Sequence, residues 1–348
     1  MAKHVIFLVH GMGEFADGWS KDVQEQIAAA YSTYAIAKTL PFKDFFRFEE
    51  ITYNRHFDKL RKQWRDDSAA VGALLKKNGL EASAVNKLAS AGGAAGAEDQ
   101  FLSTHVLDVV LYRFVPMVAE AARNEVAKRI LDTLVAAPAL DQPRWSIVAH
   151  SLGTAVAHDA LHALFTQGVN GKSLVGKTKA DLVMMIANVS RLLEEPNVDV
   201  YKSVVRPSAA PAEGICRYYI NARHDWDPIP RPKAFKPLDD WPDVVTRRED
   251  RYQLVQINAF QHKNIHGLEH YLSNPKVHVA LFRRLIPIDG AIPKEEADGA
   301  SAKFEASTPF GQFEALQQAI KKFQIAEEST WSQVIAAYQG FFETLKAF

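Results

Sequence analysis

The segment 144–161, RWSIVAHSLGTAVAHDAL, constrains the fold of this chain more than any other. Its first half is mostly apolar, as in a buried strand, and its second half has the spacing of a helix with an apolar face. Small residues stand two positions before and two positions after Ser151, at Ala149 and Gly153. Because only a very tight turn requires small residues there, we predict a strand, a sharp turn at Ser151 and then a helix.

A serine at the apex of such a turn projects away from the backbone, and we expect the hydroxyl of Ser151 to be exposed. The helix that follows supplies backbone N–H groups and the positive end of its dipole. Both features suit a nucleophile in acyl transfer, where negative charge develops beside the attacking oxygen. Many strand-to-helix turns have the pattern small-x-Ser-x-Gly without any chemistry, so a purely structural turn is the alternative interpretation.

A glycine-rich turn also follows the first predicted strand. Residues 5–9, VIFLV, form an apolar run with the length of a strand buried on both faces of a parallel sheet. The next four residues are His10, Gly11, Met12 and Gly13. Glycines let the backbone approach a ligand closely, and we expect the N–H groups of Met12 and Leu152 to form an oxyanion hole. The alternative is that the glycines only turn the chain toward a helix.

These two motifs resemble those of the α/β-hydrolase superfamily, in particular its lipase-like and esterase-like members. His-Gly-x-Gly stands at 10–13 and Ala-His-Ser-Leu-Gly at 149–153, in the order that this family has. The resemblance covers residues 1–286 and implies a doubly wound, mostly parallel α/β sheet with Ser151 as the nucleophile. It also implies a triad in the chain order Ser, then Asp or Glu, then His.

The acid candidates lie in the stretch 216–230, CRYYINARHDWDPIP. Tyr218 to Ile220 has the pattern of a strand, and Asp225 and Asp227 follow it. The family often carries Asp-Pro-Ile or Asp-Pro-Val here, which favours Asp227 over Asp225. Proline holds the backbone just after the acid and keeps it out of helices and strand pairing. A solvated turn is the alternative, since Asp-Pro is a common turn pair.

Four histidines follow the next predicted strand, residues 252–258: His262, His266, His270 and His278. The pair Asn-Pro at 274–275 has the pattern of a helix N-cap with proline at the first helical position, which places His278 inside a helix. The other three are expected in the loop before that helix, where the family has its triad histidine. Family members often show histidine shortly before Tyr-Leu-x-x-Pro, matched here at 271–275, so His266 is favoured and His270 is the alternate.

These residues imply a serine hydrolase that cleaves a carboxylic ester, with a small acyl or lipid-like molecule as substrate. A neighbouring imidazole takes the proton of the serine hydroxyl, the acid orients that imidazole, and an acyl-enzyme forms. Thioesters and amides would use the same residues, so a thioesterase or amidase is an alternative. An α/β-hydrolase scaffold that only binds other molecules is the alternative from a different class. Acyl chain length and leaving group stay open.

Composition argues against several other classes. The 348 residues suit one α/β domain with insertions, and 41 basic against 41 acidic residues give no electrostatic basis for binding nucleic acid or an anionic membrane. Cys216 is the only cysteine, which excludes an intrachain disulfide. The chain has no apolar run long enough to span a bilayer, no signal-peptide pattern and no metal-ligand spacing of histidines. We therefore expect a cytoplasmic protein without metal or cofactor.

Alternating strand and helix patterns run along the chain, as a doubly wound sheet requires. We predict further strands at 48–53 and 181–187 and helices at 22–37, 57–75 and 118–135. A helical insertion at about 55–138 precedes Ser151. Within it, the stretch 82–97 is rich in Ala, Ser and Gly and predicts a flexible connection, with a mobile lid as the alternative. Large apolar residues from Phe101 to Phe114 favour a core over an acyl-binding cleft.

The chain changes character after residue 286. Residues 287–308 are rich in Pro, Gly, Ala and charge and predict a linker. Two amphipathic helices are expected within 309–348, with apolar stripes at 313–323 and 331–345. We expect these helices to dock on the hydrolase domain. Covering the cleft, or contacting a second copy or another partner, are the alternatives.

Overall fold

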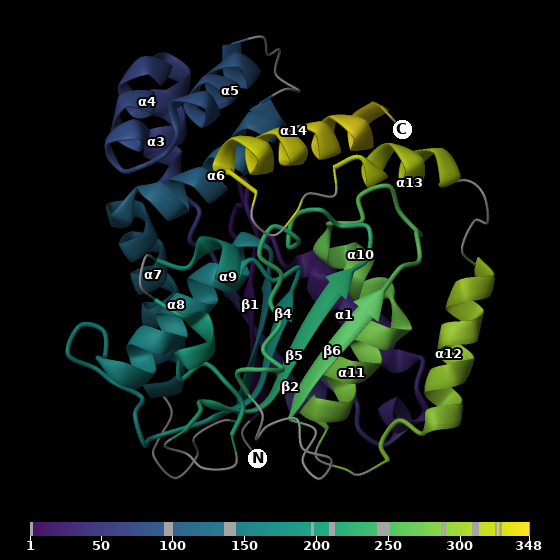
Figure 1. Ribbon diagram of the computed structural model, residues 1–348. Helices are drawn as coiled ribbons and strands as arrows, with labels where there is room; N and C mark the ends of the chain where they lie inside the picture. The colour runs from purple at the N-terminus through teal and green to yellow at the C-terminus, as the bar shows by residue number, and fades with distance from the viewer. Residues whose placement is uncertain are drawn as a thin grey trace.

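The computed structural model describes residues 3–93, 100–135, 144–195, 198–208, 213–241, 251–286, 288, 290–307, 313–323, 326 and 329–347. In these residues one six-stranded, all-parallel sheet forms the centre of an α/β fold, with helices on both faces (Figure 1). The predicted α/β class with a parallel sheet is therefore confirmed. No helix in the described ranges has the length and apolar character needed to cross a membrane.

The strands occur in the spatial order β2-β1-β3-β4-β5-β6. Their bounds are β1 (His4–Val9), β2 (Phe46–Ile51), β3 (Trp145–His150), β4 (Ala180–Ile186), β5 (Cys216–His224) and β6 (Tyr252–Ile257). Strands β1, β3 and β4 are buried at every residue, which explains their continuous apolar sequences. The order changes direction at β1, since β2 lies on one side of it and β3 on the other. Ligand sites in open α/β sheets form at the carboxyl ends of strands at such a point.

Each face of the sheet packs against its own layer of helices. One layer contains α1 (Lys21–Ser32), α10 (Leu268–Ser273) and α11 (Pro275–Leu285), and the other contains α7 (Pro116–Val135) and α8 (Leu152–Thr166). Successive residues of β1 alternate between the two apolar cores: Phe7 belongs to one core, and Ile6 and Leu8 belong to the other. Two-sided burial therefore accounts for the sheet's stability.

The remaining elements are η1 (Ala35–Lys38), α2 (Phe42–Phe45), α3 (Arg55–Asp66), α4 (Ser68–Lys77), α5 (Ala82–Gly93), α6 (Gln100–Phe114), α9 (Ser190–Leu193), η3 (Val200–Lys202), α12 (Lys294–Ser307), α13 (Glu314–Lys321) and α14 (Trp331–Ala347). The predicted single helix at 57–75 is divided at Asp67, whose side chain accepts a hydrogen bond from the N–H of Ala70 and caps α4. An aspartate at this position competes for the helical backbone and starts a new helix.

The prediction of a flexible connection at 82–97 is wrong for residues 82–93, which form α5. Val85 and Leu88 are buried in the core, and α5 packs against α14. Alanine has the highest helix propensity, so an Ala-rich stretch becomes a helix where a few apolar residues anchor it. Residues 94–97 lie outside the described ranges.

Most of the stretch predicted as a linker, 287–308, is helical, because α12 occupies Lys294–Ser307. No residue of this helix is buried. A helix that buries no residue needs no apolar stripe, and without that stripe its sequence does not predict a helix. It lies against α11, and its Glu296 accepts a hydrogen bond from the N–H of Ala35 (2.6 Å). Ala297 and Ala300 of this helix also pack against the apolar core that includes α11, so both polar and apolar contacts hold it.

The C-terminal helices dock on the rest of the chain. Helix α14 lies across the carboxyl end of the sheet and contacts α5 and α6, with α13 beside it (Figure 1). Its Ile335, Tyr338 and Phe341 are buried in the same core that covers one face of the sheet. This position brings the end of the chain to the edge of the sheet where the strands terminate.

Candidate active site

Ser151 occupies a strained turn between β3 and α8. Its backbone has φ 52° and ψ −126°, a combination that is uncommon for any residue other than glycine. Two contacts hold the turn: the N–H of Ser151 donates to the carbonyl of Ile186 (2.9 Å), and its own carbonyl accepts from Thr154 Oγ1 (2.6 Å). Strain of this kind persists only where the surroundings enforce it, and it is common at functional sites.

The two glycine motifs lie directly against each other. A Cβ atom on Gly153 would stand only 2.1 Å from the carbonyl oxygen of His10, and one on Gly11 would stand 3.0 Å from Cβ of Ser151. The helix after Ser151 can therefore pack on the turn after β1 only because position 153 has no side chain. This is the physical reason for the small residue that the sequence pattern requires.

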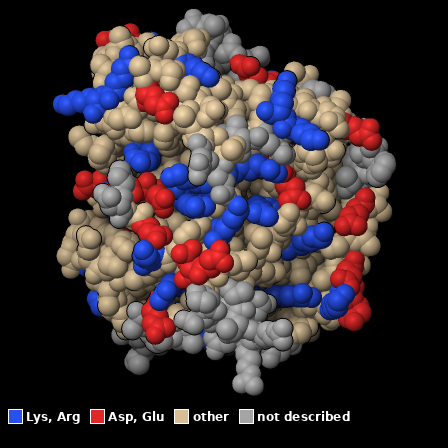
Figure 2. All heavy atoms as spheres, in the orientation of Figure 1, with Lys and Arg blue, Asp and Glu red and all other residues tan. Residues whose placement is uncertain are grey.

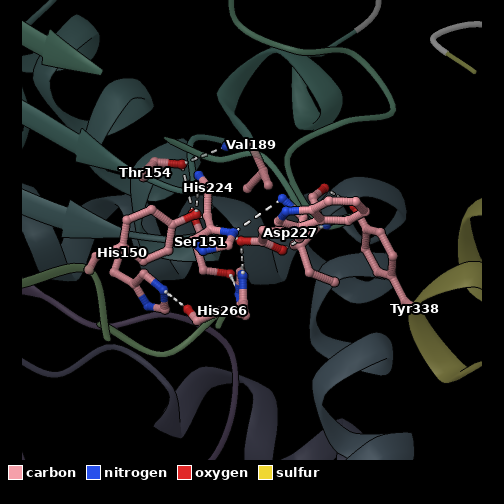
Figure 3. Close-up of polar contacts among 11 residues, drawn as sticks. His150, Ser151, Thr154, Val189, His224, Asp227, His266 and Tyr338 are labelled. Atoms are coloured by element: carbon pink, nitrogen blue, oxygen red, sulfur yellow. Dashed lines mark hydrogen bonds and ion pairs between the residues drawn. The ribbon is translucent and has the colours of Figure 1, made fainter. Parts of the chain in front are cut away.

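Ser151, His266 and Asp227 form one chain of hydrogen bonds (Figure 3). The distance from Ser151 Oγ to His266 Nε2 is 2.8 Å, and that from His266 Nδ1 to Asp227 Oδ2 is 2.7 Å. The three side chains follow β3, β6 and β5, whose carboxyl ends meet at one edge of the sheet. The structure thus brings together the serine, the acid and the histidine that the sequence favoured.

Asp227 is fully buried and held in the charged form. Its Oδ1 accepts from the N–H of Ile229 (3.0 Å), and its Oδ2 accepts from the hydroxyl of Tyr271 (3.0 Å) as well as from His266. Burial alone would raise the pKa of Asp227, but His266 and these hydrogen bonds lower it below its usual value. Sequence reasoning used Tyr271 only to locate the histidine and missed its contact with the acid.

The two alternates do not join this chain. Asp225 is half-buried and accepts a hydrogen bond from Gln256 Nε2 (2.5 Å). The expectation that His270 lies in a loop is wrong, because α10 begins at Leu268 and includes it. Its buried ring packs against the ring of His224 (5.2 Å between centroids), and burial lowers the pKa of His270 to about 3.

The remaining two histidines of this segment also differ in their surroundings. His262 is at 6.1 Å from His270, measured between ring centroids, and is not part of the chain to Ser151. His278 lies in α11, as the pattern at 274–275 predicted, and the side chain of Asn274 caps that helix. The ring of His278 bonds to Tyr34 and to the carbonyl of Leu272, so its role is structural.

The side chain of His150 holds the backbone of His266 in place. Its Nε2 donates to the carbonyl of His266 at 2.7 Å, and the two rings lie 4.9 Å apart between centroids. Burial lowers the pKa of His150 to about 3, so this ring is neutral and has a single N–H to donate. The hydrogen bond to His266 therefore explains why a histidine precedes Ser151, and the local sequence pattern does not indicate this contact.

The two expected oxyanion donors are on turns that touch each other. Leu152 follows Ser151 at the N-terminus of α8, and Met12 lines the same cavity as Ser151. Within the described ranges neither the N–H of Met12 nor that of Leu152 has a hydrogen-bond acceptor. An oxyanion donor must likewise have no other acceptor.

A buried ion pair that the sequence did not indicate holds the turn containing Met12. Asp108 Oδ2 accepts from the N–H of Gly13 (2.8 Å), and the Asp108 carboxylate binds Arg61 Nε and Nη2 at 2.6 and 2.7 Å. Arg61 Nη2 also donates to the carbonyl of Gly13 (3.0 Å). The backbone of Gly13 has φ 118°, a conformation that favours glycine. Because Arg61 is on α3 and Asp108 on α6, the helical insertion positions this turn.

His10 shapes the same turn from its other side. Its ring is stacked between Phe15 (4.3 Å between centroids) and Tyr53 (4.2 Å). Its Nδ1 donates to the carbonyl of Gly11 (2.7 Å), and its Nε2 accepts from the N–H of Tyr53 (3.3 Å). Burial lowers the pKa of His10 to about 3, so we assign it a structural role as a neutral ring.

The expectation of an exposed serine is wrong, because Ser151 is 0% exposed. It faces a cavity of about 200 Å³ with a largely apolar lining that includes Phe15, Trp19 and Phe342. Phe342 comes from α14, and its ring lies 6.3 Å from that of His266 between centroids. The C-terminal helix therefore docks on the fold and also covers the site.

Most of the large apolar residues considered for an acyl cleft are in the core. Leu107, Leu111, Tyr112 and Phe114 are buried there and do not line the cavity, and the side chain of Phe101 lies outside the described residues. His105, on the same helix, does line the cavity and contacts the ring of Phe342 (5.8 Å between centroids). Helix α6 thus contributes to the wall through a residue that the sequence did not single out.

In the described ranges no group of three or more His, Cys, Asp or Glu side chains is arranged to hold a metal ion. The chain matches no protein-family model, and no curated protein is significantly similar to it. The function of the site must therefore be inferred from its own geometry.

Proposed function

We propose that this protein is a serine hydrolase of the α/β-hydrolase type that cleaves carboxylic esters. The hydrogen-bonded chain from Ser151 through His266 to Asp227, with the serine on a strained strand-to-helix turn, carries this proposal. The chain order Ser, Asp, His and the glycines on both adjoining turns agree with the nucleophile elbow of that fold. A scaffold that only binds other molecules would need neither the strained turn nor the charged acid.

In the proposed reaction, His266 Nε2 takes the proton of Ser151 Oγ while this oxygen attacks the carbonyl carbon of the ester. His266 Nδ1–H donates to Asp227, whose charge stabilises the imidazolium. The N–H groups of Met12 and Leu152 and the positive end of α8 stabilise the oxyanion. His266 then protonates the leaving alkoxide as the C–O bond breaks.

Water completes the cycle. His266 takes a proton from a water molecule, whose oxygen attacks the acyl carbon of the acyl-enzyme. His266 then returns this proton to Ser151 Oγ as the bond between that oxygen and the acyl carbon breaks and the carboxylic acid is released. Nucleophile, base, acid and oxyanion donors are all groups of this chain, so the proposed reaction requires no metal or cofactor. A cytoplasmic location remains a prediction from the sequence.

The cavity beside Ser151 favours a compact apolar acyl group. Its volume of about 200 Å³ is small, since pockets for drug-sized ligands start at about 300 Å³. Phe15, Trp19 and Phe342 supply apolar contact, while Asn264 and Glu269 are polar members of the lining. We therefore propose short-chain or aromatic acyl esters as substrates in preference to long-chain lipids. Thioesters of the same acyl groups would react at the same atoms.

A fluorophosphonate probe together with p-nitrophenyl esters from acetate to palmitate tests the proposal. Wild-type protein should be labelled and should hydrolyse the short esters fastest, whereas Ser151→Ala should do neither. Ser83→Ala, at an exposed serine of α5, is the matched control and should behave as wild type. Folded wild-type protein that neither reacts with the probe nor hydrolyses any ester would refute the proposal.

A further inference from the structure

A second cavity lies at the carboxyl edge of the sheet, lined in part by the loop that contains Asp227. It has a volume of about 440 Å³, and its lining includes residues of β5 and β6 and of the loops after β4 and β5. It shares no lining residue with the cavity at Ser151. The ester chemistry proposed above makes no use of it.

This cavity is cationic, although the whole chain has no net charge. Its described lining contains Arg223, Arg231 and Lys236 but only one carboxylate, that of Asp225. Asp225 already accepts a hydrogen bond from Gln256, whose Oε1 accepts from Arg223 (2.9 Å). Figure 2 shows Lys and Arg side chains gathered in the middle of this face, near the carboxyl ends of the strands. An anion would therefore be attracted to this cavity.

The side chain of Arg231 lines this cavity without a hydrogen-bond acceptor from the described part of the chain. It is half-buried, makes no hydrogen bond or ion pair with another described residue, and has a buried Nε without an acceptor. Burial lowers the pKa of Arg231, and the neighbouring charge of Arg223 lowers it further, while Asp225 and Asp227 oppose this. A partly buried cation without a direct partner is costly, and a bound anion would remove that cost.

Asn221 adds a hydrogen-bond acceptor at the same cavity. It is 3% exposed, its Nδ2 donates to the carbonyl of Phe235 (3.2 Å), and its Oδ1 has no donor among the residues that the structure describes. Asparagine is disfavoured inside strands, and buried amide oxygens are nearly always satisfied. A ligand that carries a hydroxyl group would supply the missing donor.

We propose that this cavity binds a small hydroxylated oxyanion, either a phosphate ester or a hydroxy acid. Arg223 and Arg231 bind the anionic group, because a guanidinium presents paired donors that match two oxygens of a phosphate or carboxylate. Asn221 accepts a hydrogen bond from the ligand's hydroxyl group. Binding involves no step at Ser151, so it stands or falls independently of the proposed hydrolase activity.

Isothermal titration at constant ionic strength tests this site with glycerol 3-phosphate, malate and, as the neutral control, glycerol. We expect saturable binding of at least one anion at a single site, with the same affinity in Ser151→Ala, and no binding of glycerol. Arg223→Gln and Arg231→Gln should each weaken binding at least about tenfold, since each removes a charged hydrogen-bond donor. The ligand that binds more tightly identifies the phosphate ester or the hydroxy acid as the preferred class.

Arg217→Gln is the matched control. Arg217 lies on β5, as Arg223 does, but at the opposite end of the strand, where it pairs with Asp181. The binding of this variant should equal that of wild type. Arg231→Lys keeps the charge and should bind with intermediate affinity, which separates loss of binding from loss of folding. The site is disproved if neither anion binds wild type saturably, if both glutamine variants bind normally, or if Arg217→Gln loses as much affinity as they do.

Discussion

The hydroxyl of Tyr338, in the last helix, donates a hydrogen bond to the backbone carbonyl of Ile229, two residues after Asp227 (Figure 3). The same helix places Phe342 against the ring of His266. The C-terminal helix therefore touches both the loop that contains Asp227 and the ring of His266. This contact makes the end of the chain part of the site.

Tyr338→Phe should destabilise the protein and slow ester hydrolysis. The substitution leaves a buried carbonyl without its donor, which typically costs about 1–3 kcal/mol. We expect a lower urea midpoint and a lower kcat, because the loop that holds Asp227 loses an anchor. Tyr218→Phe, at a partly exposed tyrosine of β5, is the control. A Tyr338→Phe variant with unchanged stability and kcat would show that the contact has no role.

Phe342→Ala should open the cavity at Ser151. Removing the ring enlarges the space for the acyl group, so longer chains should be accepted. The measurement is the ratio of kcat/KM for p-nitrophenyl octanoate to that for p-nitrophenyl acetate, which should rise relative to wild type. Phe341→Ala, on the same helix but outside the cavity lining, should destabilise the protein without raising this ratio. An unchanged ratio in Phe342→Ala would mean that α14 does not limit the acyl group.

The acid and base assignments can be tested with paired variants. Asp227→Asn should lower kcat by about 10⁴-fold, because the imidazole loses the partner that fixes its tautomer. Asp225→Asn should have a much smaller effect. His266→Gln should abolish hydrolysis, whereas His270→Gln should mainly lower thermal stability, because its ring is buried away from Ser151. The opposite result in either pair would overturn that assignment.

Removing one member of the buried ion pair between Arg61 and Asp108 should strongly lower the stability of the protein. Asp108→Asn removes the only buried carboxylate that pairs with Arg61 among the described residues and leaves it the exposed carboxylates of Asp58 (2.9 Å) and Glu14 (3.9 Å). Breaking a buried pair costs up to about 3–5 kcal/mol. The double variant Arg61→Met, Asp108→Leu should lose less stability than the sum of the single variants Arg61→Met and Asp108→Leu. A double-mutant cycle from urea unfolding measures this coupling. Additive losses would show that the two residues do not act as a pair.

Buried histidines should make the protein sensitive to acid. Burial lowers the pKa of His4, His10, His150 and His270 to about 3, and that of His278 to about 4. In the unfolded chain each titrates near 6.5, so below pH 6.5 the unfolded state binds more protons than the folded state. The free energy of unfolding is therefore highest, as far as these histidines contribute, above pH 6.5. Between pH 6.5 and the lowered pKa of each buried histidine, it falls by about 1.4 kcal/mol per pH unit for that histidine.

Urea unfolding at pH 7.5, 6.0 and 5.0 measures this loss. His278→Gln should be less stable than wild type at pH 7.5 but should lose less stability as the pH falls, because one buried histidine is gone. Wild-type stability that rises between pH 6.0 and 5.0 would contradict the expectation.

Tertiary structure decided which histidine reaches Ser151 and which aspartate bonds to that histidine. His266 and His270 are four residues apart and both follow β6, but a short helix turns His270 into the core. The choice depends on where α10 begins, and packing against α1 holds that helix in place. Family resemblance favoured the residues that the structure joins, whereas their spacing alone left the alternates open.

Sequence by itself determined the local backbone: the buried strands, the turn at Ser151 with its small flanking residues, and the capped start of α11. These features depend on a few neighbouring residues, whose size and polarity limit the conformations available to them. Only the tertiary structure decided that Phe342 covers Ser151, that Arg61 pairs with Asp108, and that α5 and α12 are helices. Those outcomes depend on contacts between residues far apart in the chain, and the periodicity of a short segment carries no information about its distant partners.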